Sequence, residues 1–146
     1  MPELPEVETT RSGIEPHILN QCIEGVVVRQ PKLRWLVPEA ELDALVGQVV
    51  RRVARRGKYI LLETASGTML IHLGMSGSLR VVTDARPPLK HDHLDIRFCH
   101  GKLLRFTDPR RFGAVLWQHQ GQLHERLRTL GPEPLTDEFT IAYLHQ

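Results

Sequence analysis

Residues 49–73, VVRRVARRGKYILLETASGTMLIHL, contain apolar runs of strand length that are separated by glycine turns. The runs are Val49–Ala54, Tyr59–Thr64 and Thr68–Leu73. Short runs rich in Val, Ile and Leu, bounded by Gly, are typical of strands joined by hairpins. Arg56-Gly57 and Ser66-Gly67 supply the turns, so we expect an antiparallel meander in this part of the chain.

The same pattern extends outward in both directions. Further strands are expected at Ile23–Arg29, Leu33–Trp35, Leu79–Val82, His93–Cys99, Lys102–Thr107 and Ala114–Gln118, of which His93–Cys99 alternates as a half-buried strand does. Helical patterns are expected at Pro5–Ser12, between Pro38 and Gly47 with Leu42, Leu45 and Val46 on one side, at Gln122–Thr129 and from Asp137 to Leu144. About seven to eight short strands with helices at the ends favour a mainly-β α+β fold, either an antiparallel sandwich or a barrel.

The composition is that of one globular domain. The chain has 146 residues, of which 41% are hydrophobic and 25% charged, and a formal net charge of +2. This charge is too small to imply a polyanionic partner by itself, but basic residues cluster at 51–58 and at 110–111. Cys22 and Cys99 are far apart in the sequence without a partner pair, so we expect neither a disulfide framework nor a cysteine zinc site. The lack of a signal peptide and of a membrane-length apolar run favours a reducing cytoplasm.

The N-terminus, MPELPEVETT, can supply a covalent catalyst. An initiator Met before Pro is usually removed, which leaves Pro2 with a free secondary amine. An unprotonated amine attacks a carbonyl-like carbon and forms an iminium. Glu3 and Glu6 are close enough in sequence to move protons, and a helix that begins at Pro5 and stops at Gly13 would place its positive end beside the amine. The alternative is a frayed acidic terminus that only begins a helix.

Two turns carry further candidate residues. Lys58 follows the Gly57 turn, where a Lys can serve acid–base chemistry or, with the neighbouring arginines, bind phosphate. The alternative is a solvated strand edge. Met75 lies between Gly74 and Gly77 at a loop tip, where an exposed Met can wedge into a duplex step unless it folds back into the core.

His91, His93 and Asp95 would share one face of an extended strand, where they could ligate zinc. Because no further ligand is nearby in the sequence, a phosphate-binding or network role for His91 is at least as consistent. Arg110 and Phe112 lie in a turn, where Arg can pair with bases or phosphates and Phe can stack, unless the turn carries them incidentally. An amine, acids, a basic groove and a Met–Arg–Phe set together are typical of an enzyme that flips a nucleotide out of a duplex.

Six motifs give the chain a resemblance to a known family. They are MPELPEVET (1–9), RRGKYILLE (55–63), IHLGMSGSL (71–79), KHDHLD (90–95), TDPRRFG (107–113) and LGPEPL (130–135). As a set they closely resemble the bacterial formamidopyrimidine-DNA glycosylases, which remove 8-oxoguanine and are also AP lyases. The start reads Glu-Leu-Pro-Glu-Val, whereas the related endonuclease VIII branch has Glu-Gly-Pro-Glu, so the purine-lesion branch is indicated. The resemblance implies a two-sheet antiparallel β-sandwich with the N-terminal helix alongside.

The resemblance also implies catalytic roles. Pro2 would attack C1′ of the damaged nucleotide and displace the base, and the resulting Schiff base would permit β- and then δ-elimination. Glu3 would be the main proton donor of the glycosylase step, with Glu6 in support, and Lys58 the proton donor in β-elimination. If Met1 were retained, the nitrogen of Pro2 would be an amide and this chemistry would be blocked.

By the same resemblance, His91 and Arg110 contact DNA, and Met75, Arg110 and Phe112 fill the vacated stack and meet the orphaned base. The implied partner is double-stranded DNA that carries oxidised purines. We expect a monomer in the bacterial cytoplasm, associated with the nucleoid through DNA.

The far end of the chain departs from the family. Family members continue into a helix–two-turn–helix domain and a four-cysteine zinc finger, whose arginine assists δ-elimination, and neither is present in this sequence. We therefore expect residues 1–135 to be the catalytic domain and 136–146 the start of the connection to the missing half. No metal ligand set or cofactor is expected in this chain, and one structural zinc is expected in the missing finger. A fragment of this kind would bind DNA weakly or be inactive alone.

Two other functions stay open at the level of sequence. A non-catalytic nucleic-acid-binding module would use the basic loops alone. A metal-dependent hydrolase would use His91, His93 and Asp95.

Overall fold

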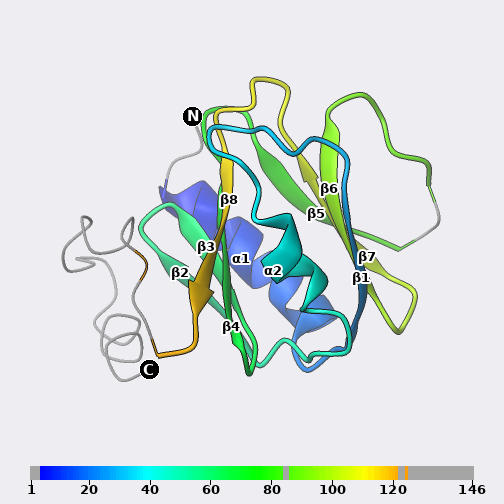
Figure 1. Ribbon diagram of the computed structural model, residues 1–146. Coiled ribbons are helices and arrows are strands. Elements are labelled where there is room, and N and C mark those ends of the chain that lie inside the picture. Colours follow the sequence, from blue (N-terminus) through cyan, green and yellow to red (C-terminus); the bar gives the residue numbers. More distant parts are fainter. Residues whose placement is uncertain (1–3, 84–85, 122–123, 125–146) are drawn as a thin grey trace.

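The computed structural model describes residues 4–83, 86–121 and 124, which form two helices and eight strands (Figure 1). The helices are α1, Leu4–Ile18, and α2, Glu39–Asp43. The strands are β1 Ile23–Val28, β2 Arg52–Arg56, β3 Tyr59–Glu63, β4 Gly67–His72, β5 Ser78–Val82, β6 Asp92–Phe98, β7 Leu103–Thr107 and β8 Ala114–His119. The helices expected at 122–129 and 137–144, and the expected domain boundary at 135, lie outside the described residues.

The strands form two separate four-stranded sheets rather than a closed barrel. One sheet has the order β1-β6-β7-β5 and the other the order β2-β3-β4-β8. Every neighbouring pair is antiparallel, and the consecutive pairs β2–β3, β3–β4 and β6–β7 are joined by hairpins. The predicted α+β, mainly-β fold, with a two-sheet antiparallel sandwich and an N-terminal helix, is confirmed.

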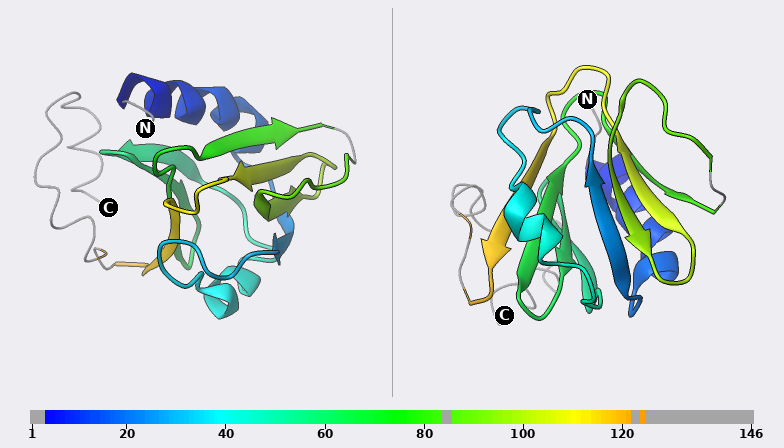
Figure 2. Two further views of the ribbon diagram at one scale, coloured as in Figure 1. Left: turned by 90° about the horizontal axis from the view of Figure 1, so that it is seen from above. Right: turned by 45° about the vertical axis from the view of Figure 1, so that its right-hand side comes forward.

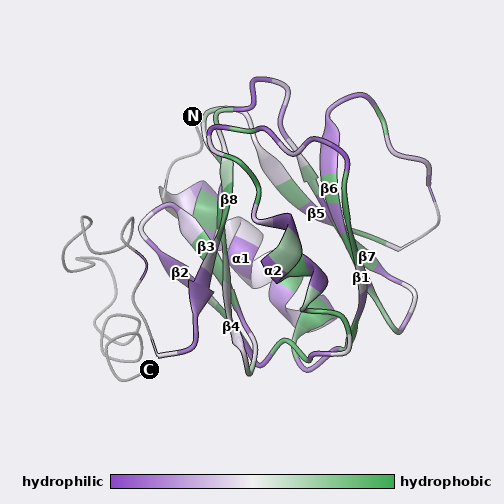
Figure 3. Ribbon diagram, in the orientation of Figure 1, coloured by the Kyte–Doolittle hydropathy of each residue, from purple (hydrophilic) through white to green (hydrophobic). Residues whose placement is uncertain are grey.

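The hydrophobic core lies between the two sheets, and Figure 3 shows hydrophobic residues along most of the strands. The inward-facing residues that form it include Ile60, Leu62, Met69, Ile71, Val115, Leu94, Ile96, Phe98, Leu104 and Phe106. Strand β2 is an exception in Figure 3, where it is largely hydrophilic because it carries three arginines. Neither helix of the described residues has the length and apolarity to cross a bilayer.

Helix α1 runs further than its sequence predicts. Val7, Ile14 and Ile18 are 0%, 3% and 0% exposed and recur at helical spacing on one face, so the helix keeps burying apolar area beyond Ser12. Gly13 was the expected stop, but it lies inside the helix with open space around it. The helix ends before Asn20, whose φ of 64° is the left-handed conformation in which helices commonly terminate.

The two helices close opposite sides of the sandwich (Figure 2). Helix α1 packs against β2 and β5, which are edge strands of different sheets, and α2 packs against β1. Glu8 fastens α1 to β2, because its carboxylate accepts hydrogen bonds from Arg11 at 2.7 Å and from buried Arg55 at 3.1 Å. The bond from Arg11 lowers the pKa of Glu8 against the effect of burial, and Arg55 lowers it further.

Three local expectations were wrong. Residues 33–35 form a bend inside a single bridge between Lys32 and Leu36 rather than a strand. Val46 was expected on the buried side of the second helix, but it follows the helix and is 52% exposed. Strand β6 was expected to be half-buried, yet residues 92–96 are all buried.

The outer face of β6 is covered by the segment that precedes it. The Arg105 guanidinium of β7 donates to the carbonyl of Arg86 at 3.2 Å, and the N–H of Leu89 donates to Asp92 at 2.7 Å. Under this cover Asp95 accepts from Arg29 at 2.5 Å and from Arg105 at 2.9 Å. Paired charges of this kind can be buried on a face that the sequence pattern assigns to solvent.

Candidate active site

The β4–β5 and β7–β8 loops, which carry several of the predicted site residues, lie at the upper end of the sandwich in Figure 1. Met75 lies in the β4–β5 loop, and Arg110 and Phe112 lie in the β7–β8 loop. Lys58 is in the β2–β3 turn, which lies near the N-terminal end of α1 in Figure 1. Pro2 and Glu3 are outside the described residues, whereas Glu6 is exposed in the first turn of α1.

Lys58 is placed by a two-residue turn between β2 and β3. Gly57 has a φ of 57°, which allows the tight hairpin that its sequence predicts. Tyr59 follows and pairs with His72 of β4, and the centroids of their two rings are 4.8 Å apart in an edge-on contact. The turn therefore holds Lys58 next to the end of β4.

His72 is a site residue that the sequence analysis did not single out. Burial lowers its pKa, and the charges of Arg34 and Lys58 lower it further. Its Nδ1 accepts the backbone N–H of Gly74 at 2.9 Å, so the neutral ring carries its proton on Nε2. The only sequence signal was a His two residues before Gly74, and the segments that carry Arg34 and Lys58 approach it only in the fold.

Asp108 joins the β4–β5 and β7–β8 loops. It is 0% exposed, and its two carboxylate oxygens accept from the Ser76 hydroxyl and from the Gly113 N–H, each at 2.8 Å. Its carbonyl accepts from Nε2 of buried His93 at 2.6 Å. A fully buried carboxylate with these partners sets the conformation of both loops.

The two loops are in backbone contact. Gly74 has a φ of 65°, and a Cβ there would lie 2.6 Å from the nitrogen of Gly113, so only glycine fits. The N–H of Arg34, from the β1–α2 loop, donates to the carbonyl of Gly113 at 3.1 Å. Three loops that are distant in sequence therefore meet around Gly113.

Met75 and Phe112 project from these adjoining loops and are 44% and 47% exposed. Met75 does not fold back into the core, which was the alternative. The Arg110 guanidinium lies 5.6 Å from the centroid of the Phe112 ring, within the range of a cation–π contact. Exposed apolar side chains beside guanidinium groups are suited to a ligand that has stacked bases and phosphates.

His91, His93 and Asp95 do not form a metal site. The ring of His93 donates a hydrogen bond to the backbone carbonyl of Asp108, and the carboxylate of Asp95 accepts hydrogen bonds from Arg29 and Arg105. Burial raises the pKa of Asp95, but the hydrogen bonds from the two arginines outweigh it and hold the pKa below its ordinary value. Within residues 4–83, 86–121 and 124, no three His, Cys, Asp or Glu side chains are arranged to hold a metal ion.

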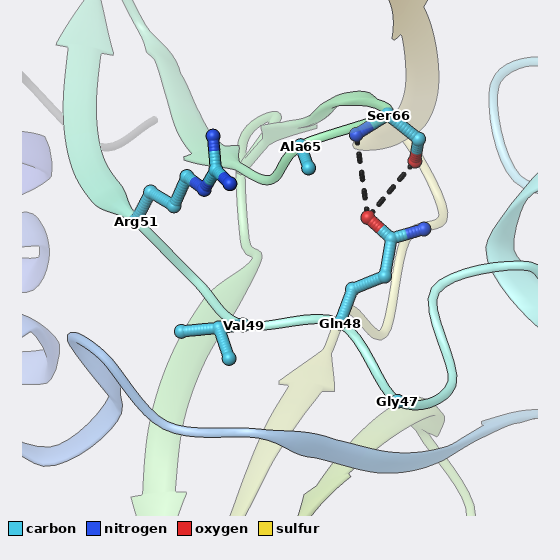
Figure 4. Close-up of a pocket in the computed structure, with 6 residues that line it drawn as sticks. All are labelled: Gly47, Gln48, Val49, Arg51, Ala65 and Ser66. Atoms are coloured by element: carbon cyan, nitrogen blue, oxygen red, sulfur yellow. Dashed lines mark hydrogen bonds between the residues drawn. The ribbon is translucent and has the colours of Figure 1, made fainter.

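A pocket of about 440 Å³ lies away from these residues (Figure 4). It is lined by Gly47, Gln48, Val49, Arg51, Ala65 and Ser66. Gln48 Oε1 accepts from the N–H and the hydroxyl of Ser66 at 3.3 and 3.0 Å, so the polar groups in the pocket bond to one another. None of the predicted site residues lines it.

Comparisons with known proteins agree with the sequence motifs. Residues 1–115 match the family model "Formamidopyrimidine-DNA glycosylase N-terminal domain". The formamidopyrimidine-DNA glycosylase of Vibrio atlanticus (strain LGP32) is 54% identical over 144 residues, which cover 99% of this chain and 53% of the relative. That of Xanthomonas euvesicatoria pv. vesicatoria (strain 85-10) is 56% identical over 146 residues, with 99% and 54% covered. The chain thus spans about half the length of the relatives it matches.

Solved structures give the same result. A complex of Lactococcus lactis Fpg (MutM) with DNA that contains Fapy-dG superposes with a TM-score of 0.74 at 34% identity, covering 81% of this chain and 44% of that chain. A complex of MutM with DNA that contains carbocyclic 8-oxo-G has a TM-score of 0.74 at 34% identity, covering 82% and 45%. Both neighbours are bound to lesion-containing DNA.

Proposed function

The chain belongs to the formamidopyrimidine-DNA glycosylase family, and we propose that it is the catalytic domain of a base-excision repair enzyme that removes oxidised purines from double-stranded DNA. The observation that carries the proposal is the pair of exposed side chains, Met75 and Phe112, on two joined loops beside Arg110. Exposed apolar side chains that are gathered on adjoining loops, rather than scattered singly, mark interaction sites. An unstacked duplex step is such a ligand.

The reaction starts at the N-terminus. The Pro2 nitrogen bonds to C1′ as the bond from C1′ to the base breaks, and the leaving base takes its proton with help from Glu3. Glu6, in the first turn of α1, supports Glu3. After the sugar ring opens, the iminium is an electron sink that makes the C2′ proton acidic, so the 3′ phosphate and then the 5′ phosphate can leave.

Lys58 serves as proton donor in β-elimination. The support for this role is its place in a tight turn beside His72, close enough for its charge to lower the pKa of that ring. His91 and Arg110 contact the DNA strands, and Met75, Arg110 and Phe112 fill the vacated stack. In support, Arg110 and Phe112 are exposed together on one loop.

Residues 1–135 form the catalytic domain, and 136–146 begin the connection to a second half that carries the helix–two-turn–helix and the zinc finger. This proposal is supported by the relatives, which are about twice as long as the chain. The structural zinc belongs to that second half, since this sequence has only two cysteines. The protein works as a monomer on the bacterial chromosome.

Covalent trapping tests the function. Because the chain spans about half the length of its relatives, the experiment uses a chimera in which residue 146 is fused to the second half of the Vibrio atlanticus relative. An intact mass first establishes that the chimera lacks Met1. The chimera is incubated with an 8-oxoguanine duplex and reduced with borohydride. We expect a stable protein–DNA adduct, and peptide mapping should place it on the Pro2 nitrogen.

A matched control is Arg97→Ala, an exposed substitution on β6 that should trap as well as the parent chimera. A folded chimera that lacks Met1 and binds the duplex without forming an adduct would show a non-catalytic nucleic-acid-binding module instead. An adduct that maps to Lys58 or another lysine would overturn the assignment of Pro2.

A further inference from the structure

Cys22 and Cys99 face each other across the pair β1–β6. Ile23 pairs with Phe98 at the end of this ladder, and the next backbone hydrogen bond runs from the Cys99 N–H to the Cys22 carbonyl at 2.9 Å. The sequence places the two cysteines far apart without a partner pair, and antiparallel pairing makes them direct neighbours. Both thiols are free in the structure, and only the pairing of the strands brings the two residues side by side.

Both thiols point to the same side. Ile23 and Phe98 are 2% and 1% exposed and face the core, and successive side chains on a strand alternate, so Cys22 and Cys99 face away from the core together. Opposite residues of a hydrogen-bonded antiparallel pair have Cα atoms about 5.5 Å apart. Disulfides form at Cα separations of roughly 4.4–6.8 Å, a range that includes the usual Cα spacing of such a pair.

The pair is accessible from solvent. Cys99 is exposed and Cys22 is partly exposed. A hydrogen bond with the Cys22 thiol raises the pKa of the Cys99 thiol, which requires that the two sulfur atoms be close. No third ligand completes a metal site with them among the described residues.

We propose that Cys22 and Cys99 form a reversible intramolecular disulfide when the protein meets a hydroperoxide. One thiolate attacks the peroxide oxygen, the O–O bond breaks, and a sulfenic acid and water (or an alcohol) form. The second thiol then attacks the sulfenic sulfur, the S–S bond forms and water leaves. Two thiols lose two electrons and two protons in all, and a dithiol reductant reverses the change.

The disulfide would lie at the end of the sandwich opposite the candidate active site. The start of β1 and the end of β6 are at the lower end in Figure 1, whereas the β4–β5 and β7–β8 loops are at the upper end. Cys22 also pairs with Val49 in an isolated backbone β-bridge, so a Cys22–Cys99 disulfide would lie where three chain segments meet. The β6–β7 hairpin is already tied to α1 there, since the His100 Nε2–H donates to the His17 carbonyl at 2.8 Å.

We therefore expect oxidation to stabilise the domain without changing how it binds DNA. A cross-link that closes a long loop restricts the unfolded chain, and the Tm should rise by roughly 5–15 °C. This inference does not depend on the proposed catalytic function.

The test uses the 146-residue chain, fully reduced and freed of reductant, then treated with hydrogen peroxide at low protein concentration. We expect the intact mass to fall by two hydrogens, the free thiols to fall from two to none, and a peptide linking Cys22 to Cys99 to appear and vanish on reduction. The Tm of the oxidised chain should exceed that of the reduced chain.

Cys22→Ser and Cys99→Ser are the matched controls. After treatment with hydrogen peroxide, the monomer of either variant should keep both hydrogens in its intact mass, and its Tm should not rise. The proposal is overturned if the wild-type chain instead gains oxygen atoms at separate cysteines, or if its disulfides link two molecules. It is equally overturned if oxidation lowers the Tm.

Discussion

Asp108 connects the two loops of the candidate site through both oxygens of its carboxylate. It accepts from Ser76 and Gly113 while its own N–H donates to the carbonyl of His91 at 3.0 Å. These hydrogen bonds fix the position of the fully buried carboxylate, and the carboxylate in turn fixes the Ser76 hydroxyl and the Gly113 N–H that donate to it. At the scale of a single residue, Asp108 is therefore the position on which the exposure of Met75 and Phe112 depends.

Asp108→Ala should lower the free energy of unfolding by about 2–4 kcal/mol, because it leaves the Gly113 N–H and the Ser76 hydroxyl without their acceptor. Urea unfolding measures the change. Asp108→Asn keeps one acceptor oxygen, so its free energy of unfolding should lie between those of the parent and of Asp108→Ala. Asp43→Ala, an exposed substitution at the end of α2, should stay within about 0.5 kcal/mol of the parent. A loss of similar size in both alanine variants would contradict this account of Asp108.

Strands β1, β6 and β7 share a buried ion network on their outer face. Asp95 of β6 accepts from Arg105 of β7 and from Arg29, which directly follows β1. The side chains of Asp95 and Arg105 are both 3% exposed, so neither charge can be left without the other. At the scale of the element, this network explains how a strand with two carboxylates can be covered on both faces.

The network makes stability depend on acidity. The pKa of Asp95 is lower in the folded chain than its ordinary value of 3.8. The contribution of its ion pairs to the free energy of unfolding is therefore fully present above pH 3.8. The contribution is lost as the pH falls through the folded pKa. Asp95→Asn should lower the free energy of unfolding by about 3–5 kcal/mol at pH 7. We expect this difference to narrow below about pH 4 in urea unfolding, and a difference independent of pH would contradict the ion-pair explanation.

The whole molecule has two chemically different ends. One end brings together Arg34, Lys58 and Arg110 with exposed Met75 and Phe112. The opposite end carries Cys22 and Cys99. This separation predicts that DNA affinity responds to substitutions at one end only.

The salt dependence of the DNA association constant shows which end of the molecule contacts the DNA. In the chimera, the logarithm of the association constant for duplex DNA should fall linearly with the logarithm of salt concentration. Arg110→Ala should reduce the magnitude of this slope by about 0.9, because one phosphate contact is lost. Arg97→Ala, which changes the one exposed residue of β6, should leave the slope unchanged. Equal slopes for the two variants would contradict the assignment of the DNA-facing end.

The sequence by itself determined the eight strands of the two sheets, their hairpins and the family, although it also predicted a strand at 33–35 that does not form. The apolar runs on either side of Gly57 became β2 and β3, because the period of a strand and the φ of a turn are local properties. The motifs around Pro2, Lys58 and Arg110 indicated the same family that the comparisons show. Residue types and short spacings are sufficient for conclusions of this kind.

Only the tertiary structure decided which distant residues meet. The length of α1 depended on the core that Ile14 and Ile18 enter. The lowered pKa of His72 depended first on its burial and then on charges from two other segments. The contact between Cys22 and Cys99 depended on the register of β1 against β6. Register and packing are set by the burial of the whole apolar surface at once, so no local pattern contains them.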